Sequence, residues 1–193
     1  MFDIILRVVK VYYCVIDIIN FEKELIKTLP AVRRDYVNSI TDENRRAQSV
    51  YAWKLLEYAL NKDYNMQNPE FVLNFNGLWG VKHDNINFSI SHSSNIVAVA
   101  LDDKKPLGID VERCSNKILK LKNKLIIESL NLPDIEALTL EWTKKESLFK
   151  SKSGKKYTYK RITDKDGCLY YLTVCADDEK VDFNCVDVNE ILY

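Results

Sequence analysis

Two acidic residues stand two positions apart in the segment PLGIDVERC (106–114), directly after a proline and a glycine. If this segment is a strand, Asp110 and Glu112 share one face, and Ile109 and Val111 share the other. Neighbouring carboxylates repel, and each raises the pKa of the other unless a cation lies between them. A divalent metal ion is the simplest such cation, but two solvated acids on an edge strand would give the same pattern.

A second group of chemically useful side chains lies in EWTKKESLFK (141–150). Trp142, Glu146 and Lys150 follow at i, i+4 and i+8, so a helix would stack them on one face. Glu146 would then add a third carboxylate, and carboxylates together with waters and a substrate phosphate form a typical Mg²⁺ site. A buried aromatic anchor followed by an ordinary i, i+4 ion pair has the same spacing, so this helix alone leaves both interpretations open.

The segment NINFSISHSSN (85–95) contains Ser91 and His92, and His92 is one of only two histidines in the chain. A histidine here could be a catalytic residue. A hydrogen-bonded structural histidine near a strand end is the alternative.

The elements that must position these residues follow from hydrophobic periodicity and turn residues. The strands are clustered rather than alternating with helices, which favours an α+β class with mainly antiparallel strands. The order strand, helix, strands occurs roughly twice, and no linker divides the halves, so we expect them to meet near 101–106 and to pack tightly. The elements expected are opening strands, helices over 21–29 and after Thr41, a short strand and a hairpin within 70–103, a strand over 107–112, helices over 115–132 and 136–152, and strands in the tail.

Length and composition restrict the function classes. A chain of 193 residues suits one domain or two small packed halves. Lysine plus arginine equal aspartate plus glutamate at 28 each, which argues against a general nucleic-acid coat. The apolar first 18 residues carry charges and many β-branched residues, which predicts strand rather than a membrane span or signal peptide. Five scattered cysteines without C-x-x-C spacing favour a reducing cytoplasm over a disulfide framework or a zinc site.

Three of these segments together resemble the surfactin-synthetase-activating type of 4′-phosphopantetheinyl transferase. FSISHS (88–93), GIDVE (108–112) and WTKKESLFK (142–150) occur in the family's order with suitable gaps, and the last two match its pattern completely. The resemblance covers about residues 28–161. It implies an α+β pseudo-dimer of two similar halves, with the active site in the cleft between them. In this chain the halves would be 1–101, with the coenzyme A contacts, and 102–193, with the magnesium and catalytic residues.

The implied reaction transfers 4′-phosphopantetheine from coenzyme A to a serine of an apo acyl or peptidyl carrier protein and releases adenosine 3′,5′-bisphosphate. By the resemblance, Asp110, Glu112 and Glu146 would bind Mg²⁺, and Glu146 could also accept the serine proton. Lys150 would stabilise or protonate the leaving phosphate, while Ser91 and His92 would contact coenzyme A. The enzyme would be a cytoplasmic monomer without a nucleic-acid or membrane partner.

The family also implies basic side chains around the first helix that hold the 3′-phosphate of coenzyme A. Two positions depart from the family pattern, because its helix arginine falls on Gln48 and its Gly-Lys-Pro becomes Gly80, Val81 and Lys82. We expect Lys82 to reach a phosphate of coenzyme A despite this shift of one place, since its stem is long and flexible. The basic candidates of the first helical region are Arg33, Arg34, Arg45 and Arg46.

Residues 141–161 hold eight basic residues against two acids, with Phe149, Tyr157 and Tyr159 among them. This run is either a solvated face or a surface that attracts an acidic carrier protein.

Two other functions are compatible with parts of the pattern. A non-catalytic module that binds coenzyme A or a carrier would keep the fold without transfer, and a magnesium-dependent nucleotide phosphohydrolase would share only the carboxylates.

Overall fold

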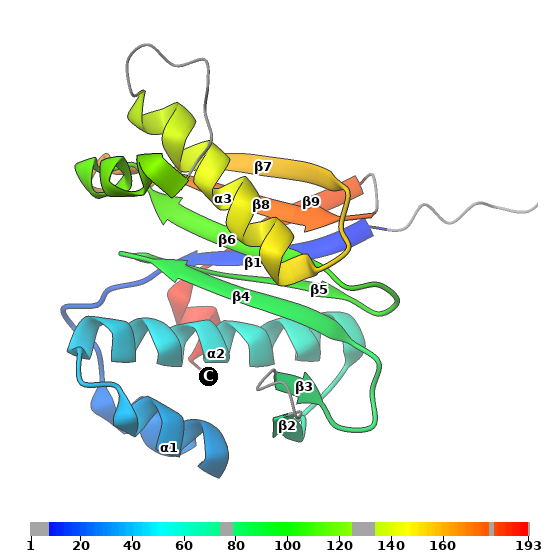
Figure 1. Ribbon diagram of the computed structural model, residues 1–193. Helices are drawn as coiled ribbons and strands as arrows, with labels where there is room; N and C mark the ends of the chain where they lie inside the picture. The colour runs from blue at the N-terminus through cyan, green and yellow to red at the C-terminus, as the bar shows by residue number, and fades with distance from the viewer. Residues whose placement is uncertain (1–7, 74–78, 125–133, 178–179, 193) are drawn as a thin grey trace, which may run out of the picture.

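The computed structural model describes residues 8–73, 79–124, 134–177 and 180–192 of the chain, and of residues 122–124 it describes the backbone alone. It confirms the α+β class (Figure 1). Two β-sheets lie face to face, and each is covered on its outer side by a long helix, α2 below and α3 above in Figure 1. Among the described residues, no helix has the length and apolar character needed to cross a membrane.

The first sheet has the strand order β4-β5-β1-β9. Its neighbours are antiparallel except β1 and β9, which run parallel with Val8 opposite Lys180. Strands β5 and β6 on either side of the expected boundary belong to different sheets, but β9, from the second half of the chain, completes the first sheet. The strands are β1 (Val8–Val15), β4 (Asn87–Ser93), β5 (Ile96–Asp102) and β9 (Lys180–Val186).

The second sheet has the order β6-β8-β7 and is wholly antiparallel, with Asp110 opposite Thr173. A separate pair, β2 (Phe71–Leu73) and β3 (Trp79–Val81), lies apart from both larger sheets. The strands of the second sheet are β6 (Gly108–Arg113), β7 (Lys156–Thr163) and β8 (Leu169–Ala176).

The described residues form three α-helices and three 3₁₀ segments. The expected helices after Thr41 and over 136–152 are confirmed as α2 and α3. The expected helix over 21–29 is a 3₁₀ turn, and the one over 115–132 begins as a 3₁₀ segment, while 125–133 lie outside the described residues. The bounds are η1 (Lys23–Thr28), α1 (Ala31–Ser39), α2 (Glu43–Tyr64), η2 (Asn116–Lys124), α3 (Ile135–Ser151) and η3 (Val188–Ile191).

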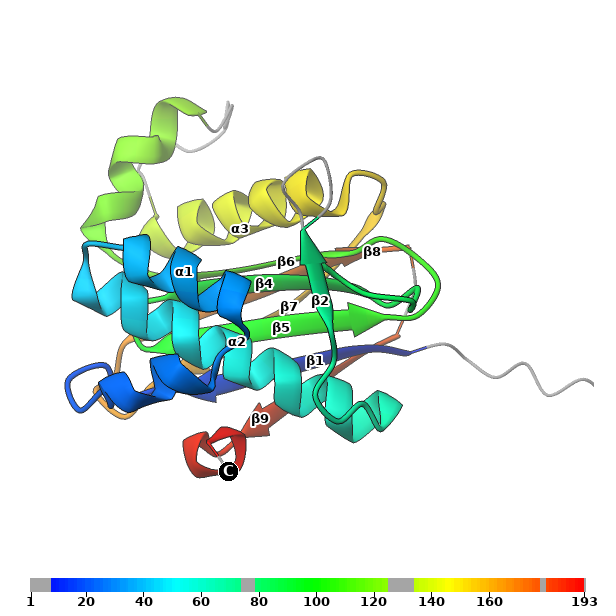
Figure 2. The same ribbon diagram turned by 90° about the horizontal axis from the view of Figure 1, so that it is seen from below.

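Alternation along the strands creates two main cores. On β5, Ile96, Ala98 and Ala100 point into the core between the sheets, while Val97 and Val99 point toward α2. From the other side, Ile109 and Val111 of β6 enter the core between the sheets. The acidic residues of β6 must therefore face the opposite side of their sheet, which α3 covers (Figures 1 and 2).

A close approach of backbone to backbone fixes α3 against β6. A Cβ atom added to Gly108 would collide with the Ser147 carbonyl oxygen and lie 2.6 Å from the Ser151 nitrogen. Only glycine fits here, which accounts for the first residue of the GIDVE segment. Further along, Thr143 Oγ1 of α3 is hydrogen-bonded to Thr173 Oγ1 of β8 at 2.7 Å. Since Thr173 lies opposite Asp110, α3 runs antiparallel to β6.

Candidate functional site

An ion pair joins the helix and the strand that carry the acidic motifs. The Nζ atom of Lys150 donates hydrogen bonds to Asp110 Oδ1 at 2.8 Å and to the Ile109 carbonyl oxygen at 2.9 Å. Asp110 is only 7% exposed. Burial raises the pKa of its carboxyl group, although the Lys150 ammonium and the hydrogen bonds from Lys150 and Ser91 act in the opposite direction.

Strand β6 is linked to the first sheet by a row of serine hydroxyls. Strands β4 and β6 lie side by side (Figure 1) but belong to different sheets, so no regular backbone pairing joins them. We call Ser89, Ser91 and Ser93 of β4 the serine row. Their Oγ atoms accept hydrogen bonds from successive inward N–H groups of β6, those of Ile109, Val111 and Arg113, at 3.1, 3.2 and 3.2 Å respectively.

Two members of the serine row also donate to the acidic residues of β6. Ser91 Oγ donates to Asp110 Oδ1 at 2.9 Å, and Ser93 Oγ donates to Glu112 Oε1 at 2.8 Å. Asp110 Oδ1 is thus shared with Lys150, and Glu112 Oε1 also accepts the Arg113 N–H at 3.1 Å. From the described part of the chain, the second oxygen of each carboxylate accepts no hydrogen bond. Both second oxygens retain their capacity to bind a cation.

Glu146 lies on the same face of α3 as Lys150, one turn earlier in the helix. Because α3 runs antiparallel to β6, this turn is displaced from Lys150 toward the Glu112 end of the strand. Within the described ranges, no group of three or more histidine, cysteine or acidic side chains is close enough to hold a metal ion as it stands. The carboxylates with an open oxygen are the kind of ligand that Mg²⁺ prefers, and Mg²⁺ commonly takes only one or two of them and keeps several waters.

A small cavity of about 260 Å³ opens on the other side of β4, between that strand and the α1–α2 region. Its lining includes His92 of β4, Arg45 at the start of α2, Ser49 and Tyr36. The Arg45 side chain is exposed and has no hydrogen bond or ion pair with the residues that the structure describes. Thus His92 and Arg45, predicted from separate segments, lie around one cavity.

Arg33 supports this cavity from behind. Its guanidinium is 4.6 Å from the centre of the Trp53 ring and 4.8 Å from that of Tyr36, and it donates to Ser49 Oγ at 2.7 Å. Arg33 is only 8% exposed, and its Nε atom has no hydrogen-bond partner among the residues that the structure describes. Burial lowers the pKa of Arg33 from its ordinary value. No carboxylate of the described residues pairs with this charge, and the carboxylate of Asp42, in the lining of the cavity, accepts the Arg45 backbone N–H instead.

The same charges act on His92. Burial, followed by the positive charges of Lys150, Arg45 and Arg33, lowers the pKa of His92 to about 4. The imidazole is therefore neutral near pH 7 and can donate one hydrogen bond without adding charge. Lys150 contributes to this shift from the acidic side of the sheet, so the cavity and the Asp110–Lys150 pair influence each other electrostatically.

The remaining predicted basic residues have other partners. Arg34 donates to the Lys27 carbonyl oxygen, and Arg46 donates through two nitrogens to the Ile40 carbonyl oxygen. Gln48, at the family's arginine position, donates to the Ser94 carbonyl oxygen at 2.8 Å and joins α2 to the β4–β5 turn. The structure therefore brings Arg45 to the lining of the His92 cavity, places Arg33 behind Ser49 of that lining, and uses Arg34 and Arg46 for local backbone contacts.

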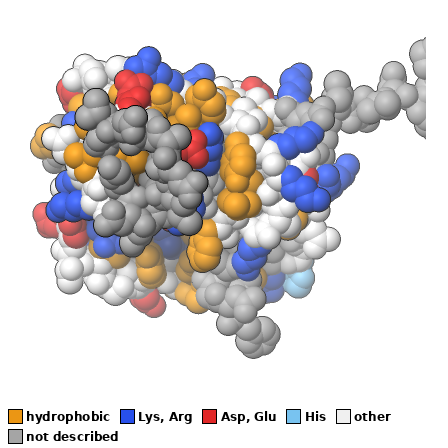
Figure 3. All heavy atoms as spheres, turned by 45° about the horizontal axis from the view of Figure 1, so that its top comes forward, with side chains coloured by type: hydrophobic (Ala, Val, Ile, Leu, Met, Phe, Trp, Pro, Cys, Tyr) orange, Lys and Arg blue, Asp and Glu red, His pale blue; other side chains and the backbone are white. Residues whose placement is uncertain are grey.

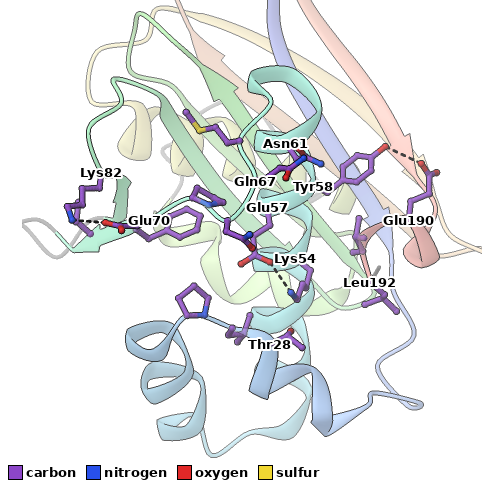
Figure 4. A pocket seen from close by; sticks show the side chains of 18 residues that line it. Thr28, Lys54, Glu57, Tyr58, Asn61, Gln67, Glu70, Lys82, Glu190 and Leu192 are labelled. Carbon is purple, nitrogen blue, oxygen red and sulfur yellow. Dashed lines mark hydrogen bonds and ion pairs between the residues drawn. The ribbon is translucent and has the colours of Figure 1, made fainter.

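Lys82 lies elsewhere, beside a larger pocket of about 890 Å³ on the outer side of α2 (Figure 4). Its Nζ atom pairs with Glu70 at 2.6 Å, and the lining also includes the Lys54–Glu57 pair and Tyr58. The His92 cavity has a separate lining. Lys82 is thus not grouped with His92 or Arg45, and its contact with coenzyme A stays a prediction.

The basic segment forms part of the face over α3 (Figure 3), where hydrophobic and basic side chains are intermixed. Phe149 is 80% exposed, and Tyr157 and Tyr159 of β7 are also exposed. Large apolar side chains in contact with water are characteristic of an interaction surface.

The motif comparison missed the contact of Ser93 with Glu112 and the bonds that Ser89 and Ser93 make to the backbone of β6. Their signal was present, because serine alternates with larger residues in SISHS, so a strand must present all three hydroxyls on one face. Only the position of β4 beside β6 reveals their acceptor and donor partners.

Comparison with known proteins adds no family assignment to this geometry. No family model matches the chain, and no curated protein matches it.

Proposed function

We propose that this protein is a 4′-phosphopantetheinyl transferase of the surfactin-synthetase-activating type, which loads a serine of an apo acyl or peptidyl carrier protein from coenzyme A. The observation that carries the proposal is the contact between Lys150 and Asp110. It brings the two segments that match the family pattern completely into one site, although 40 residues separate them. Ser91, from the third segment, donates to the same carboxylate oxygen.

The proposed architecture is the family's pseudo-dimer. Its support is the layer order of helix α2, first sheet, second sheet and helix α3, in which each half supplies one covering helix and, apart from β9 in the first sheet, the strands of one sheet. The exchanged strand β9 is compatible with this architecture, because it lies at the far edge of the first sheet, away from β4. The proposed site lies where β4 of one half meets β6 of the other.

Coenzyme A would bind across this junction. Its 3′-phosphate and adenosine would occupy the His92 cavity, where Arg45 supplies an exposed charge and Arg33 a buried one. The pyrophosphate would extend toward Lys150 and the open oxygens of Asp110 and Glu112. A bound phosphate would compensate the positive charges of Lys150, Arg45 and Arg33, which add to the effect of burial in depressing the pKa of His92.

In the reaction, the carrier serine oxygen attacks the phosphorus of the phosphopantetheine half, a new P–O bond forms, and the P–O bond to the nucleotide half breaks. Mg²⁺ held by Asp110, Glu112 and Glu146 would neutralise charge on the pyrophosphate oxygens. Lys150 stabilises the charge that develops on the leaving adenosine 3′,5′-bisphosphate. Glu146 accepts the serine proton directly or through a water molecule. The acidic surface around the carrier serine would face the basic and aromatic side chains of residues 141–161.

The proposal is tested by incubating the protein with candidate apo carrier proteins, coenzyme A and Mg²⁺ and measuring the intact carrier mass. A mass increase of one phosphopantetheine group, absent without Mg²⁺ and with a serine-to-alanine carrier, supports the transferase. Binding of coenzyme A or carrier without loading of any carrier would identify a binding module. Release of phosphate from nucleotides without an acceptor protein would identify a phosphohydrolase.

A further inference from the structure

The serine row has a feature that the coenzyme A contacts of the family pattern do not explain. Each hydroxyl accepts a hydrogen bond from a backbone N–H of β6, so its own proton is free to be donated. Ser91 and Ser93 donate that proton to Asp110 and Glu112, whereas Ser89 donates to no carboxylate of the described residues. The row therefore divides into two residues that contact the acids and one that contacts only the strand.

The direction of these hydrogen bonds restricts the carboxylates. Each serine binds one oxygen of its carboxylate, Oδ1 of Asp110 or Oε1 of Glu112, and so limits rotation about the last side-chain bond. The other oxygen of each group is left open on the face of β6 that α3 covers. Without the serine, a glutamate side chain in particular would sample several rotamers, and part of the binding free energy for a cation would be lost in ordering it.

We infer that Ser93 is a positioning residue that holds Glu112 in the orientation required to bind a divalent cation, as Ser91 does for Asp110. The inference rests on the metal site of the proposed function. It also assigns the N-terminal half a part in metal binding, because the donors lie on β4 and the ligands lie on β6. Removing the Ser93 hydroxyl does not leave the Arg113 N–H without an acceptor, because this N–H also donates to Glu112 Oε1 at 3.1 Å. The hydroxyl is therefore not required to satisfy the backbone of β6.

Ser89 supplies a matched control. Replacing Ser89 by alanine removes one hydrogen bond between β4 and β6, and replacing Ser93 removes two, one of which is the hydroxyl donor to the Glu112 carboxylate. Ser93→Thr retains a hydroxyl and suits a strand, because β-branched side chains are well tolerated there. The three variants separate a role in joining the strands from a role in orienting Glu112.

The experiment is a titration of the free protein with Mn²⁺, as a substitute for Mg²⁺, followed by electron paramagnetic resonance in the absence of coenzyme A. We expect Ser93→Ala to raise the Kd for Mn²⁺ by about 10- to 100-fold, the usual effect of losing a hydrogen bond to a metal ligand. Ser93→Thr should restore binding, and Ser89→Ala should leave the Kd unchanged while lowering Tm, because it too removes a hydrogen bond between β4 and β6. Equal Kd values for Ser89→Ala and Ser93→Ala, or no Mn²⁺ binding by the wild type, would overturn the inference.

A carrier-loading assay of the same proteins separates this inference from the proposed function. If Ser93→Ala weakens Mn²⁺ binding but no carrier is loaded by the wild type, the positioning role stands and the transferase proposal fails. If the wild type loads a carrier and binds Mn²⁺ but Ser93→Ala matches Ser89→Ala in affinity, the transferase proposal stands and the positioning role fails.

Discussion

Lys150 donates to both the side chain of Asp110 and the carbonyl oxygen of the residue before it, at 2.8 and 2.9 Å. The ammonium thus balances a carboxylate that is largely buried and also attaches the C-terminal half of α3 to the start of β6. A cation that binds Asp110 must either share this carboxylate with Lys150 or release the lysine toward a substrate phosphate. Under the proposed function, Lys150 is the group whose partner would change when substrate binds.

From this contact we predict that Lys150→Ala lowers kcat for carrier loading by about 100-fold or more, the usual loss for a group that stabilises charge in the transition state. The Kd for coenzyme A should change much less, because the interaction is strongest with the leaving phosphate. Steady-state kinetics and calorimetry provide the two values. An increase in Kd that accounts for the whole loss, with kcat unchanged, would make Lys150 a binding residue only.

Removal of any one carboxylate should abolish loading. Asp110→Asn, Glu112→Gln and Glu146→Gln preserve the shape of the side chain but remove a charged ligand. Mg²⁺ is then held weakly, because the negative charge of the site no longer balances the charge of the ion. Folding should survive, because the amides can still accept hydrogen bonds from the serine row. Carrier mass is measured over a range of Mg²⁺ concentrations, with circular dichroism as the control for folding. A variant that loads at the wild-type rate at limiting Mg²⁺ would exclude its residue from the metal site.

The three basic side chains around α2 should differ in their effects on coenzyme A. Arg45→Ala should weaken binding by about 1–3 kcal/mol at low salt, the range for a hydrogen bond to a charged group. Arg46→Ala should leave Kd nearly unchanged and lower stability instead, since its guanidinium binds the Ile40 carbonyl. Lys82→Ala tests the larger pocket, and calorimetric titration measures all three. A loss of affinity in Lys82→Ala but not in Arg45→Ala would place the nucleotide beside Glu70.

The lowered pKa of His92 predicts that the stability of the protein depends on pH. Its pKa is about 4 in the folded chain and about 6.5 in the unfolded chain, so the unfolded state binds more protons between these values. The contribution of the neutral imidazole to the free energy of unfolding is fully present above about pH 6.5 and is lost as the pH falls toward about 4. Urea denaturation of wild type and His92→Gln should show the difference between them shrinking over this interval.

His83→Asn is the control for that measurement, because His83 is exposed and its backbone has a positive φ of 65°, which asparagine tolerates. Its stability should parallel that of the wild type at every pH. If His92→Gln also runs parallel to the wild type from pH 7 to pH 4, the imidazole is not buried as described.

Gly108→Ala should destabilise the protein by at least about 1–3 kcal/mol, because the added methyl group overlaps the backbone of α3. Since α3 carries Glu146 and Lys150, loading should fall together with stability. Gly80→Ala provides the comparison, as nothing lies within 4 Å of the added Cβ, and its free energy of unfolding should change by less than about 1 kcal/mol. Chemical denaturation of both variants measures their free energies of unfolding. Equal values would mean that α3 does not approach β6 so closely.

The sequence predicted the elements that carry the acidic motifs, because strand alternation and helical spacing are local signals. It did not predict α1, whose inward side is occupied by Arg33 beside Val37 rather than by a regular apolar stripe. Nor did it predict the contacts of Ser93, because these depend on the register between β4 and β6, strands of different sheets. The grouping of Arg45 with His92 likewise depends on how α2 crosses β4 in three dimensions.

The parallel pairing of β9 with β1 has a consequence for synthesis of the chain. Strand β1 begins at Val8 and pairs with β9, which begins at Lys180. The first sheet therefore gains its fourth strand only after nearly the whole polypeptide has left the ribosome. Closure of so long a loop costs entropy before the pairing is gained, which slows folding relative to a chain of local contacts. Residues 1–101 on their own would also expose the free edge of β1. The two halves are therefore expected to fold and unfold together, as one cooperative unit, rather than as modules that can be cut apart.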